Sequence, residues 1–384
     1  MNRRGNRIGV ERLADPDAPP VKQLFIVRHA QSKWNAAQKS RDVRTLLAYR
    51  DHPLTQRGCD QAEALAAAIT SVMRNGPENE HFAGRKVLAG LMKADAIWSS
   101  PHTRALQTAL IGLRPLHTSP MPTSPTPSPS AGRAATTPAT AGAETAAAAA
   151  DGAPAYEASA SGSISRETGN EDAQKGSTLP IRLKPAAREK KNLGGFDTIG
   201  VCRGERCLLR AMSELQPHMP ADTLEQMRFT CVDATEVKRK WWSGMRDSKQ
   251  QLHQRMAALL EEIRASPHSS IVLVGHSHFF REFFRAYLND KWREASPHVA
   301  TDLCKHRIPN CSVACCQIDF SVGPQVITDV SLYSPDVYVK LTAGASNPTL
   351  CVKGEPVSPT ANAALRLYAR QPFAPITVAG QEVL

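Results

Sequence analysis

The stretch QLFIVRHAQSKWN, residues 23–35, decides how the rest of the chain is interpreted. Four apolar residues, Leu24 to Val27, run directly into Arg28 and His29. A short apolar run bounded by polar residues is typical of a buried strand. A guanidinium and an imidazole are costly to bury without partners. The stretch therefore predicts either a solvent-facing strand end or an anion site where the sheet stops.

The bulk composition narrows the class of protein. At 384 residues the chain has ample length for a large core. No apolar run approaches the roughly 18–20 residues that a bilayer span needs, and the basic amino-terminal segment lacks the apolar part of a secretory signal. The nine cysteines lack paired zinc-site spacing and predict reduced thiols. We therefore expect a cytoplasmic protein that does not associate with a membrane.

The charge is distributed unevenly along the chain. The formal net charge is +11, yet residues 116–178 hold three basic and six acidic residues, so the excess positive charge lies outside this segment. A basic folded part suits an anionic ligand. No long Lys/Arg run or aromatic-basic motif is present, which argues against nucleic acid as the partner. The sequence carries no signal for the oligomeric state.

Composition also divides the chain into parts. Residues 116–178 are rich in Pro, Ser, Thr and Ala and nearly devoid of large apolar side chains, so they cannot bury enough surface to offset their ordering entropy. We predict a long, low-complexity, disordered insertion there. The other predicted parts are a disordered tail at 1–21, one domain at 22–335 with its core in 22–115 and 179–335, and a C-terminal extension at 336–384.

On both sides of the insertion, strand-like and helix-like patterns alternate. The predicted strands are 23–29, 94–100, 179–189, 269–279, 312–320 and 324–333, with the last two at the sheet edge. The predicted helices are 54–73, which Thr55 caps, 101–113, 247–265 and 279–288. This alternation indicates an α/β domain with a mostly parallel central sheet flanked by helices, hence three layers.

Chemically versatile side chains follow several of these strands. Ligands of open α/β sheets bind outside the carboxyl ends of the strands. The residues found there are Arg28, His29, Arg104, Glu189 and His276. Two arginines can grip a phosphoryl group, a neutral histidine can attack it, and an acid can protonate the leaving oxygen. This set predicts covalent catalysis through a phosphohistidine, and none of its steps needs a metal or another cofactor.

Four blocks of sequence resemble one family, the histidine phosphatase superfamily, also called phosphoglycerate-mutase-like. VRHAQSKWN, at 27–35, is similar to its signature Arg-His-Gly-x-Ser-x-x-Asn, with Ala30 in place of the glycine. HPLTQRGCDQAEALA at 52–66, SSPHTRALQTA at 99–109 and LVGHSHFFR at 273–281 resemble three further family blocks, in the family's order. The resemblance implies a phosphoglycerate-mutase-like fold.

The resemblance also implies a role for each matching residue. It makes His29 the phosphorylated nucleophile, with Arg28, Arg104 and His276 completing the phosphate pocket. Asn35 would contact the phosphate or its ester oxygen, with help from Ser32. Glu189 would be the general acid, and Glu205 and Glu236 are the alternatives for that role.

The resemblance implies a metal-independent phosphomonoester hydrolase. Its expected substrate is a phosphorylated small molecule or a phosphoprotein, chosen by loops at 36–52 and 190–245. The sugar-phosphate mutases carry a Thr-Gly-Trp stretch and a Glu-Arg-x-Tyr-Gly stretch that this chain lacks, which disfavours a mutase. A phosphate-binding scaffold protein with little catalysis remains the alternative from another class.

Overall fold

The computed structural model describes residues 21–75, 84–117, 179–191, 195–242 and 247–334, together with four short strands nearer the carboxyl end. All of these belong to one unit of the chain, Met1–Ser119 with Thr178–Leu384. The predicted tail at 1–21 and the predicted insertion at 116–178 fall almost wholly outside the described residues. Their disorder therefore stays a prediction.

Seven strands form the central sheet, in the order β4-β3-β2-β5-β1-β6-β7. Their bounds are β1 Val21–Arg28, β2 Ala96–Ser99, β3 Ile181–Leu183, β4 Val232–Asp233, β5 Ser270–Gly275, β6 Val313–Asp319 and β7 Ile327–Tyr333. The five from β4 to β1 are parallel, and β6 and β7 continue the sheet antiparallel. The mostly parallel sheet is confirmed. Only β7 of the two predicted edge strands lies at the edge, because β6 pairs with β1 on one side and with β7 on the other.

The strands are apolar throughout because helices cover both faces of the sheet. Along β1, Phe25 and Val27 join the core on one face, and Leu24 and Ile26 join the core on the other. This is the alternation that a pleated strand imposes. A strand buried on both faces reads as a continuous apolar run, which is how the opening stretch reads.

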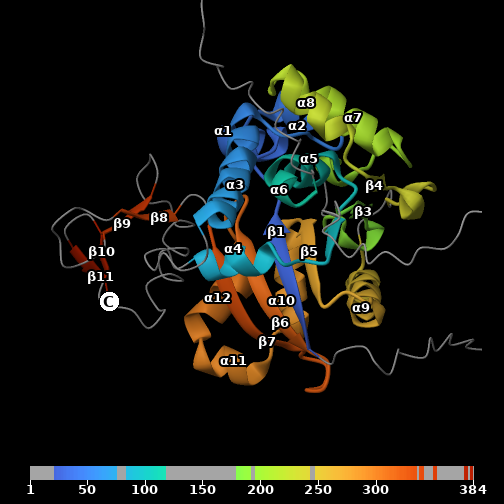
Figure 1. Ribbon diagram of the computed structural model, residues 1–384. Coiled ribbons are helices and arrows are strands. Elements are labelled where there is room, and N and C mark those ends of the chain that lie inside the picture. Colours follow the sequence, from blue (N-terminus) through green and yellow to red (C-terminus); the bar gives the residue numbers. More distant parts are fainter. Residues whose placement is uncertain are drawn as a thin grey trace, which may run out of the picture. The chain divides into compact units, whose positions relative to one another are not determined.

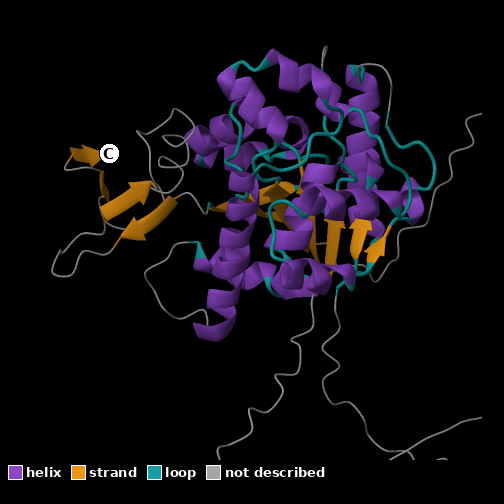
Figure 2. Ribbon diagram, turned by 90° about the horizontal axis from the view of Figure 1, so that it is seen from above, coloured by secondary structure: helices purple, strands orange, loops and turns teal. Residues whose placement is uncertain are grey.

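Helices from the first half of the chain pack mainly on one face of the sheet, and those from the second half on the other (Figures 1 and 2). The first group is α3 Gln56–Asn75, α4 Arg85–Leu91, α5 Thr103–Gly112 and α6 Arg114–His117, joined by α7 Arg206–Leu215 and α8 Ala221–Arg228. The second is α9 Lys249–Ala265, α10 Ser277–Tyr287, α11 Asp290–Ala295 and α12 Pro297–Lys305. The predicted three-layer α/β architecture is confirmed.

Capping residues fix where two of the predicted helices begin. Thr55 Oγ1 accepts a hydrogen bond from Gly58 N at 3.0 Å, as the predicted cap of α3 should. At α9, Ser248 Oγ accepts from Gln251 N at 3.0 Å, and the Gln251 side chain accepts from Ser248 N at 2.9 Å. This reciprocal pair is a capping box, and it satisfies two helix-end donors.

Two parts of the sequence interpretation need correction. The strand predicted over 179–189 ends at Leu183, because Pro185 begins the 3₁₀ turn η1 Pro185–Ala187. The segments 36–52 and 190–245, predicted as loops, contain helices. These are α1 Lys33–Ser40 and α2 Val43–Ala48 in the first, and α7 and α8 in the second. Short amphipathic helices of this kind depend on packing more than on local signals.

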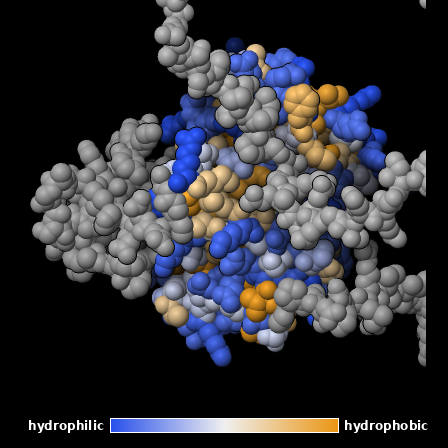
Figure 3. All heavy atoms as spheres, in the orientation of Figure 1, coloured by the Kyte–Doolittle hydropathy of each residue, from blue (hydrophilic) through white to orange (hydrophobic). Residues whose placement is uncertain are grey.

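The C-terminal extension contains a separate four-stranded sheet, in the order β11-β10-β9-β8. Its strands are β8 Val337–Lys340, β9 Thr349–Val352, β10 Ile376–Val378 and β11 Gln381–Val383. Among the residues that the structure describes, no helix has both the length and the apolar character to cross a bilayer. On the face drawn in Figure 3, hydrophilic side chains predominate among the coloured residues, and apolar ones gather in smaller separate areas.

Candidate active site

The site lies where three neighbouring parallel strands end. Backbone bonds continue the sheet one residue past those ends, with His29 N donating to Gly275 O at 3.0 Å and Ser100 N donating to Val274 O at 2.8 Å. The residues that follow β1, β2 and β5 are therefore adjacent. The ring centroids of His29 and His276 lie 5.1 Å apart, and both side chains are buried.

The backbone of the next residue fixes the orientation of the His29 ring. Its Nδ1–H donates to the carbonyl of Ala30 at 2.7 Å, which leaves Nε2 as the nitrogen with the lone pair. That Nε2 faces Nε of Arg104 at 3.4 Å. Burial, and then the charges of Arg104 and Arg28, lower the pKa of His29 well below 6.5. His29 is therefore neutral at neutral pH, with an unprotonated Nε2 that can act as a nucleophile.

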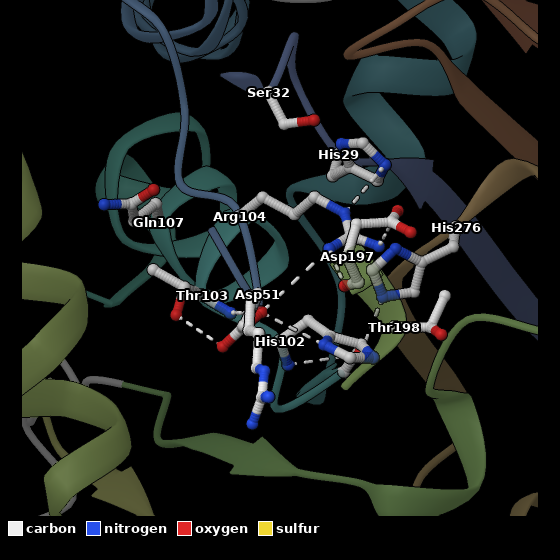
Figure 4. Close-up of polar contacts among 12 residues, drawn as sticks. His29, Ser32, Asp51, His102, Thr103, Arg104, Gln107, Asp197, Thr198 and His276 are labelled. Carbon is white, nitrogen blue, oxygen red and sulfur yellow. Dashed lines mark hydrogen bonds and ion pairs between the residues drawn. The ribbon is translucent and has the colours of Figure 1, made fainter. Parts of the chain in front are cut away.

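Arg104 extends from α5 across the centre of the site and is almost completely buried. Besides facing His29, its Nη1 donates to the carbonyl of Asp197 at 2.8 Å. Its Nη2 lies 3.3 Å from Oδ2 of the same residue, and the two side chains meet end to end in Figure 4. The guanidinium is thus held in one orientation next to the candidate nucleophile.

Asp51 lies 3.9 Å from Arg104, Oδ1 to Nη1, and is bonded to His102. No local pattern in the sequence indicated either residue. Oδ1 of Asp51 accepts from His102 Nδ1 at 3.0 Å and from Thr103 N at 3.0 Å, and Oδ2 accepts from Thr103 Oγ1 at 2.7 Å (Figure 4). Asp51 thereby caps the start of α5 from another segment. Burial alone would raise the pKa of Asp51, but the bonds from His102 and Thr103 and the charge of Arg104 outweigh it and lower the pKa. Asp51 has a left-handed backbone, with φ 52°, a conformation that aspartate tolerates better than most residues.

His276 adds a second imidazole to the site. Its Nε2 is 2.8 Å from Ser100 Oγ, and its ring meets that of His102 edge-on, with centroids 5.1 Å apart. Burial, and then the charge of Arg104, lower its pKa well below 6.5. Three buried polar atoms around His29 have no hydrogen-bond partner among the described residues: Arg28 Nε, His102 Nε2 and His276 Nδ1. Of these, Arg28 Nε is a donor suited to an anion, whereas His102 Nε2 carries a lone pair because its Nδ1–H donates to Asp51.

Arg28 is also buried. Its Nη1 donates to the carbonyl of Ile308. Burial, and then the nearby charge of Arg307, lower the pKa of Arg28 to about 10, so it stays a cation at neutral pH. The structure therefore brings Arg28, His29, Arg104 and His276 to the carboxyl edge of the sheet, as the sequence predicted for these positions.

Ser32 and Asn35 are engaged with each other at the start of α1. Ser32 Oγ accepts from Asn35 N, and Asn35 Oδ1 accepts from Ser32 N, both at 3.3 Å. This is a capping box. The Asn35 amide nitrogen and the Ser32 hydroxyl hydrogen are not used by these bonds, so their contact with a phosphate stays a prediction.

Glu189 is buried at the start of α10. Oε1 accepts from Phe279 N at 2.9 Å and from Lys190 N at 2.8 Å. Oε2 accepts from His278 N at 3.4 Å. The carboxylate thus satisfies backbone donors at a helix N-terminus, where negative charge is favourable.

The two alternative candidates for the general acid, Glu205 and Glu236, are more exposed than Glu189. Glu205 is exposed just before α7. Glu236 pairs with Lys184 and leaves 44% of its side chain exposed. Of the three glutamates, only Glu189 is buried.

A second buried acid, Asp197, lies in the 3₁₀ turn η2 Phe196–Thr198 and was also missed from the sequence. Burial raises the pKa of Asp197 to about 6, and the negative charges of Glu189 and Asp51 add to this rise against the opposing charge of Arg104. Asp197 stands within the stretch REKKNLGGFDTIG, 188–200, and no local pattern distinguished it from the residues around it. In the described part of the chain, no group of three or more His, Cys, Asp or Glu side chains has the arrangement of a metal site.

The two segments predicted to choose the substrate pack against each other. Arg210 Nη2 on α7 donates to the carbonyl of Arg50 at 3.4 Å. Just before the first segment, Lys33 Nζ lies 3.7 Å from Glu214 Oε2. Their role in specificity stays a prediction.

Comparison with known proteins gives one family match. The model of the histidine phosphatase superfamily (branch 1) matches residues 24–75, which include Arg28, His29, Ser32 and Asn35. No curated protein matches the chain in sequence. Solved structures that resemble the chain include phosphoglycerate mutase from Bacillus anthracis str. Sterne (14% identity, TM-score 0.33, covering 82% of this chain and 92% of that one). A mycobacterial glucosyl-3-phosphoglycerate phosphatase also resembles it (14% identity, TM-score 0.33, covering 82% and 98%). The family match over residues 24–75 confirms the resemblance to the histidine phosphatase superfamily that the sequence motifs showed.

Proposed function

We propose that this protein is a metal-independent phosphomonoester hydrolase that forms a phosphohistidine on His29. The observation that carries the proposal is the setting of that residue: a buried, neutral imidazole whose Nδ1–H is held by Ala30 O and whose Nε2 faces the guanidinium of Arg104. A neutral histidine beside a fixed cation is suited to attack a phosphoryl group whose charge the cation offsets.

The reaction has two steps. Nε2 of His29 attacks the phosphorus, and the bond from phosphorus to the ester oxygen breaks as that oxygen takes a proton from a buried acid. Water then attacks the phosphohistidine, the acid takes back a proton from the water, and inorganic phosphate leaves. Arg104, Arg28 and His276 contact the non-bridging oxygens, through the buried nitrogens described above.

The test is hydrolysis of 4-nitrophenyl phosphate in excess EDTA by the wild type, His29→Ala and His253→Ala. His253 is exposed on α9 and serves as the matched control. We expect His29→Ala to lose ~10³-fold or more of the turnover, as removal of a nucleophile does, and His253→Ala to retain it. Quenched wild type should also carry an acid-labile phosphoryl group that His29→Ala lacks, with far-UV circular dichroism confirming that both variants fold.

Folded wild type without turnover and without a phosphoenzyme between pH 5 and 8 would refute the hydrolase. That result, together with tight binding of inorganic phosphate, would favour the phosphate-binding scaffold. Transfer of the phosphoryl group to a second substrate hydroxyl in preference to water would instead favour a mutase.

A further inference from the structure

Two buried acids border the candidate active site, and they are held in different ways. An alkoxide is a poor leaving group, so cleavage of an alkyl phosphate requires a proton donor at the ester oxygen. The sequence motifs point to Glu189 for this role. The contacts of the two carboxylates point instead to Asp197.

Glu189 is occupied by backbone donors. Oε1 accepts from both Phe279 N and Lys190 N, and Oε2 accepts from His278 N. A proton on Oε1 would compete with two N–H donors, of which Phe279 N is buried, and Oε2 accepts one longer bond. Glu189 therefore fixes the first turn of α10, which begins directly after His276.

Asp197 has a different environment. The ion pair that the structure gives its carboxylate is with Arg104 Nη2, at 3.3 Å, and Figure 4 shows the two groups meeting. Arg104 Nε in turn faces His29 Nε2. One guanidinium therefore links Asp197 to the nitrogen that attacks, and an ester bound on Arg104 must lie next to this acid.

The turn that carries Asp197 is held firmly in place. Thr198 Oγ1 donates to Gly195 O at 2.7 Å, which closes the turn. A Cβ at Gly200 would meet the ring of Trp241 at 2.5 Å, so the chain passes in direct contact with that ring. Trp241 itself packs edge-on against His102, with ring centroids 4.9 Å apart. The position of Asp197 is thus tied to the same side chains that support Arg104.

Charge favours a protonated Asp197 once substrate is bound. The charged groups that act on it are Arg104, Glu189 and Asp51, and Arg104 in turn faces His29. Burial raises its pKa to about 6, so part of the free protein already carries the proton near neutral pH. A phosphate dianion on Arg104 adds negative charge beside the carboxylate and competes for its counter-ion. Both effects raise the proton affinity of Asp197 further.

We propose that Asp197 donates the proton to the leaving oxygen, and that Glu189 is a positioning residue that holds the start of α10 and thereby His276. The inference rests on the proposed phosphohistidine mechanism. As the phosphorus–oxygen bond breaks and the bond to His29 Nε2 forms, the Asp197 hydroxyl transfers its proton to the departing alkoxide. The resulting carboxylate then takes a proton from the water that attacks the phosphohistidine.

The experiment compares Asp197→Asn and Glu189→Gln on two substrates that differ in their need for a proton. The aryl ester 4-nitrophenyl phosphate leaves readily as an anion, whereas glycerol 1-phosphate must be protonated. We expect Asp197→Asn to lower kcat on the alkyl ester ~10²-fold or more and on the aryl ester less than ~10-fold, since general acids contribute about that much. Glu189→Gln should lower both rates by similar factors. Asp247→Asn, which removes the buried carboxylate that pairs with Arg255, controls for loss of buried charge and should also affect both esters alike.

A pH profile gives a second readout on folded protein. With the alkyl ester, kcat/KM of the wild type should fall above pH about 6, the pKa of Asp197 in the free protein, and this limb should be missing in Asp197→Asn. Equal losses on both esters in Asp197→Asn, or a loss confined to the alkyl ester in Glu189→Gln, would overturn the inference while leaving the phosphohistidine mechanism intact. Wild type without turnover or phosphoenzyme would refute the mechanism and the inference together.

Discussion

Nε of Arg104 lies 3.4 Å from Nε2 of His29, although the two residues are 75 positions apart in the chain. The distance brings a fixed positive charge against the one ring nitrogen of His29 that its backbone contact leaves available. That charge opposes protonation of the imidazole, and burial acts in the same direction. The same contact therefore serves the nucleophile and the anion that the nucleophile would attack.

Arg104→Lys should lower kcat/KM for 4-nitrophenyl phosphate about 10²–10³-fold, the usual cost of one lost donor to a developing charge. A lysine is a single point charge and cannot face His29 while also holding both the carbonyl and the carboxylate of Asp197. Steady-state kinetics measure the loss. Arg114→Lys is the control, because Arg114 forms a two-pronged pair with Glu63 outside the site and its replacement should leave the rate unchanged. A wild-type rate in Arg104→Lys would contradict the proposed clamp.

Asp51→Asn should reduce the free energy of unfolding by about 1–3 kcal/mol, the cost of leaving buried donors without acceptors. The change removes one of the carboxylate oxygens that hold His102 and Thr103. Urea unfolding at pH 7 measures the loss. Asp42→Asn is the matched control, since Asp42 caps the exposed start of α2 through Thr45, and we expect a smaller effect there. Equal losses in the two variants would show that Asp51 is only a helix cap.

His117→Gln should make the stability of the protein less sensitive to acid. Burial lowers the pKa of His117 to about 4, whereas in the unfolded chain it has its ordinary value of 6.5. As the pH falls below 6.5 the unfolded chain takes up this proton first, so the stabilisation is present above pH 6.5 and is lost towards pH 4. Between pH 7 and pH 5 the wild type should lose about 2 kcal/mol more than His117→Gln.

Urea unfolding of both proteins at the two pH values measures that difference. A glutamine amide can donate to the carbonyls of Ala109 and Leu110 that His117 contacts, so the variant should fold. The buried histidines of the site have lowered pKa values too, and they should leave some acid sensitivity in both proteins. Parallel losses in the two proteins would show that His117 is not the source.

Local sequence pattern predicted the order of the main strands and helices correctly. The apolar run Leu24 to Val27 reads as a strand because both of its faces are buried, and the turn residue Thr55 reads as a cap because its hydroxyl bonds three residues ahead. Local pattern did not predict that β3 ends at Leu183, nor did it predict the helices α1, α2, α7 and α8. Their limits depend on a proline turn and on packing partners from elsewhere in the chain.

The sequence by itself determined the strand–helix order, the position of Arg28, His29 and His276 at strand ends, and that of Arg104 at the start of a following helix. Apolar periodicity and motif spacing are properties of neighbouring residues. Only the tertiary structure decided that Asp51, His102 and Asp197 belong to the same site. Asp51 meets His102 across 51 positions, and Asp197 meets Arg104 across 93. Burial and pairing of a charged side chain depend on what the fold brings beside it, and no local pattern in the chain records that.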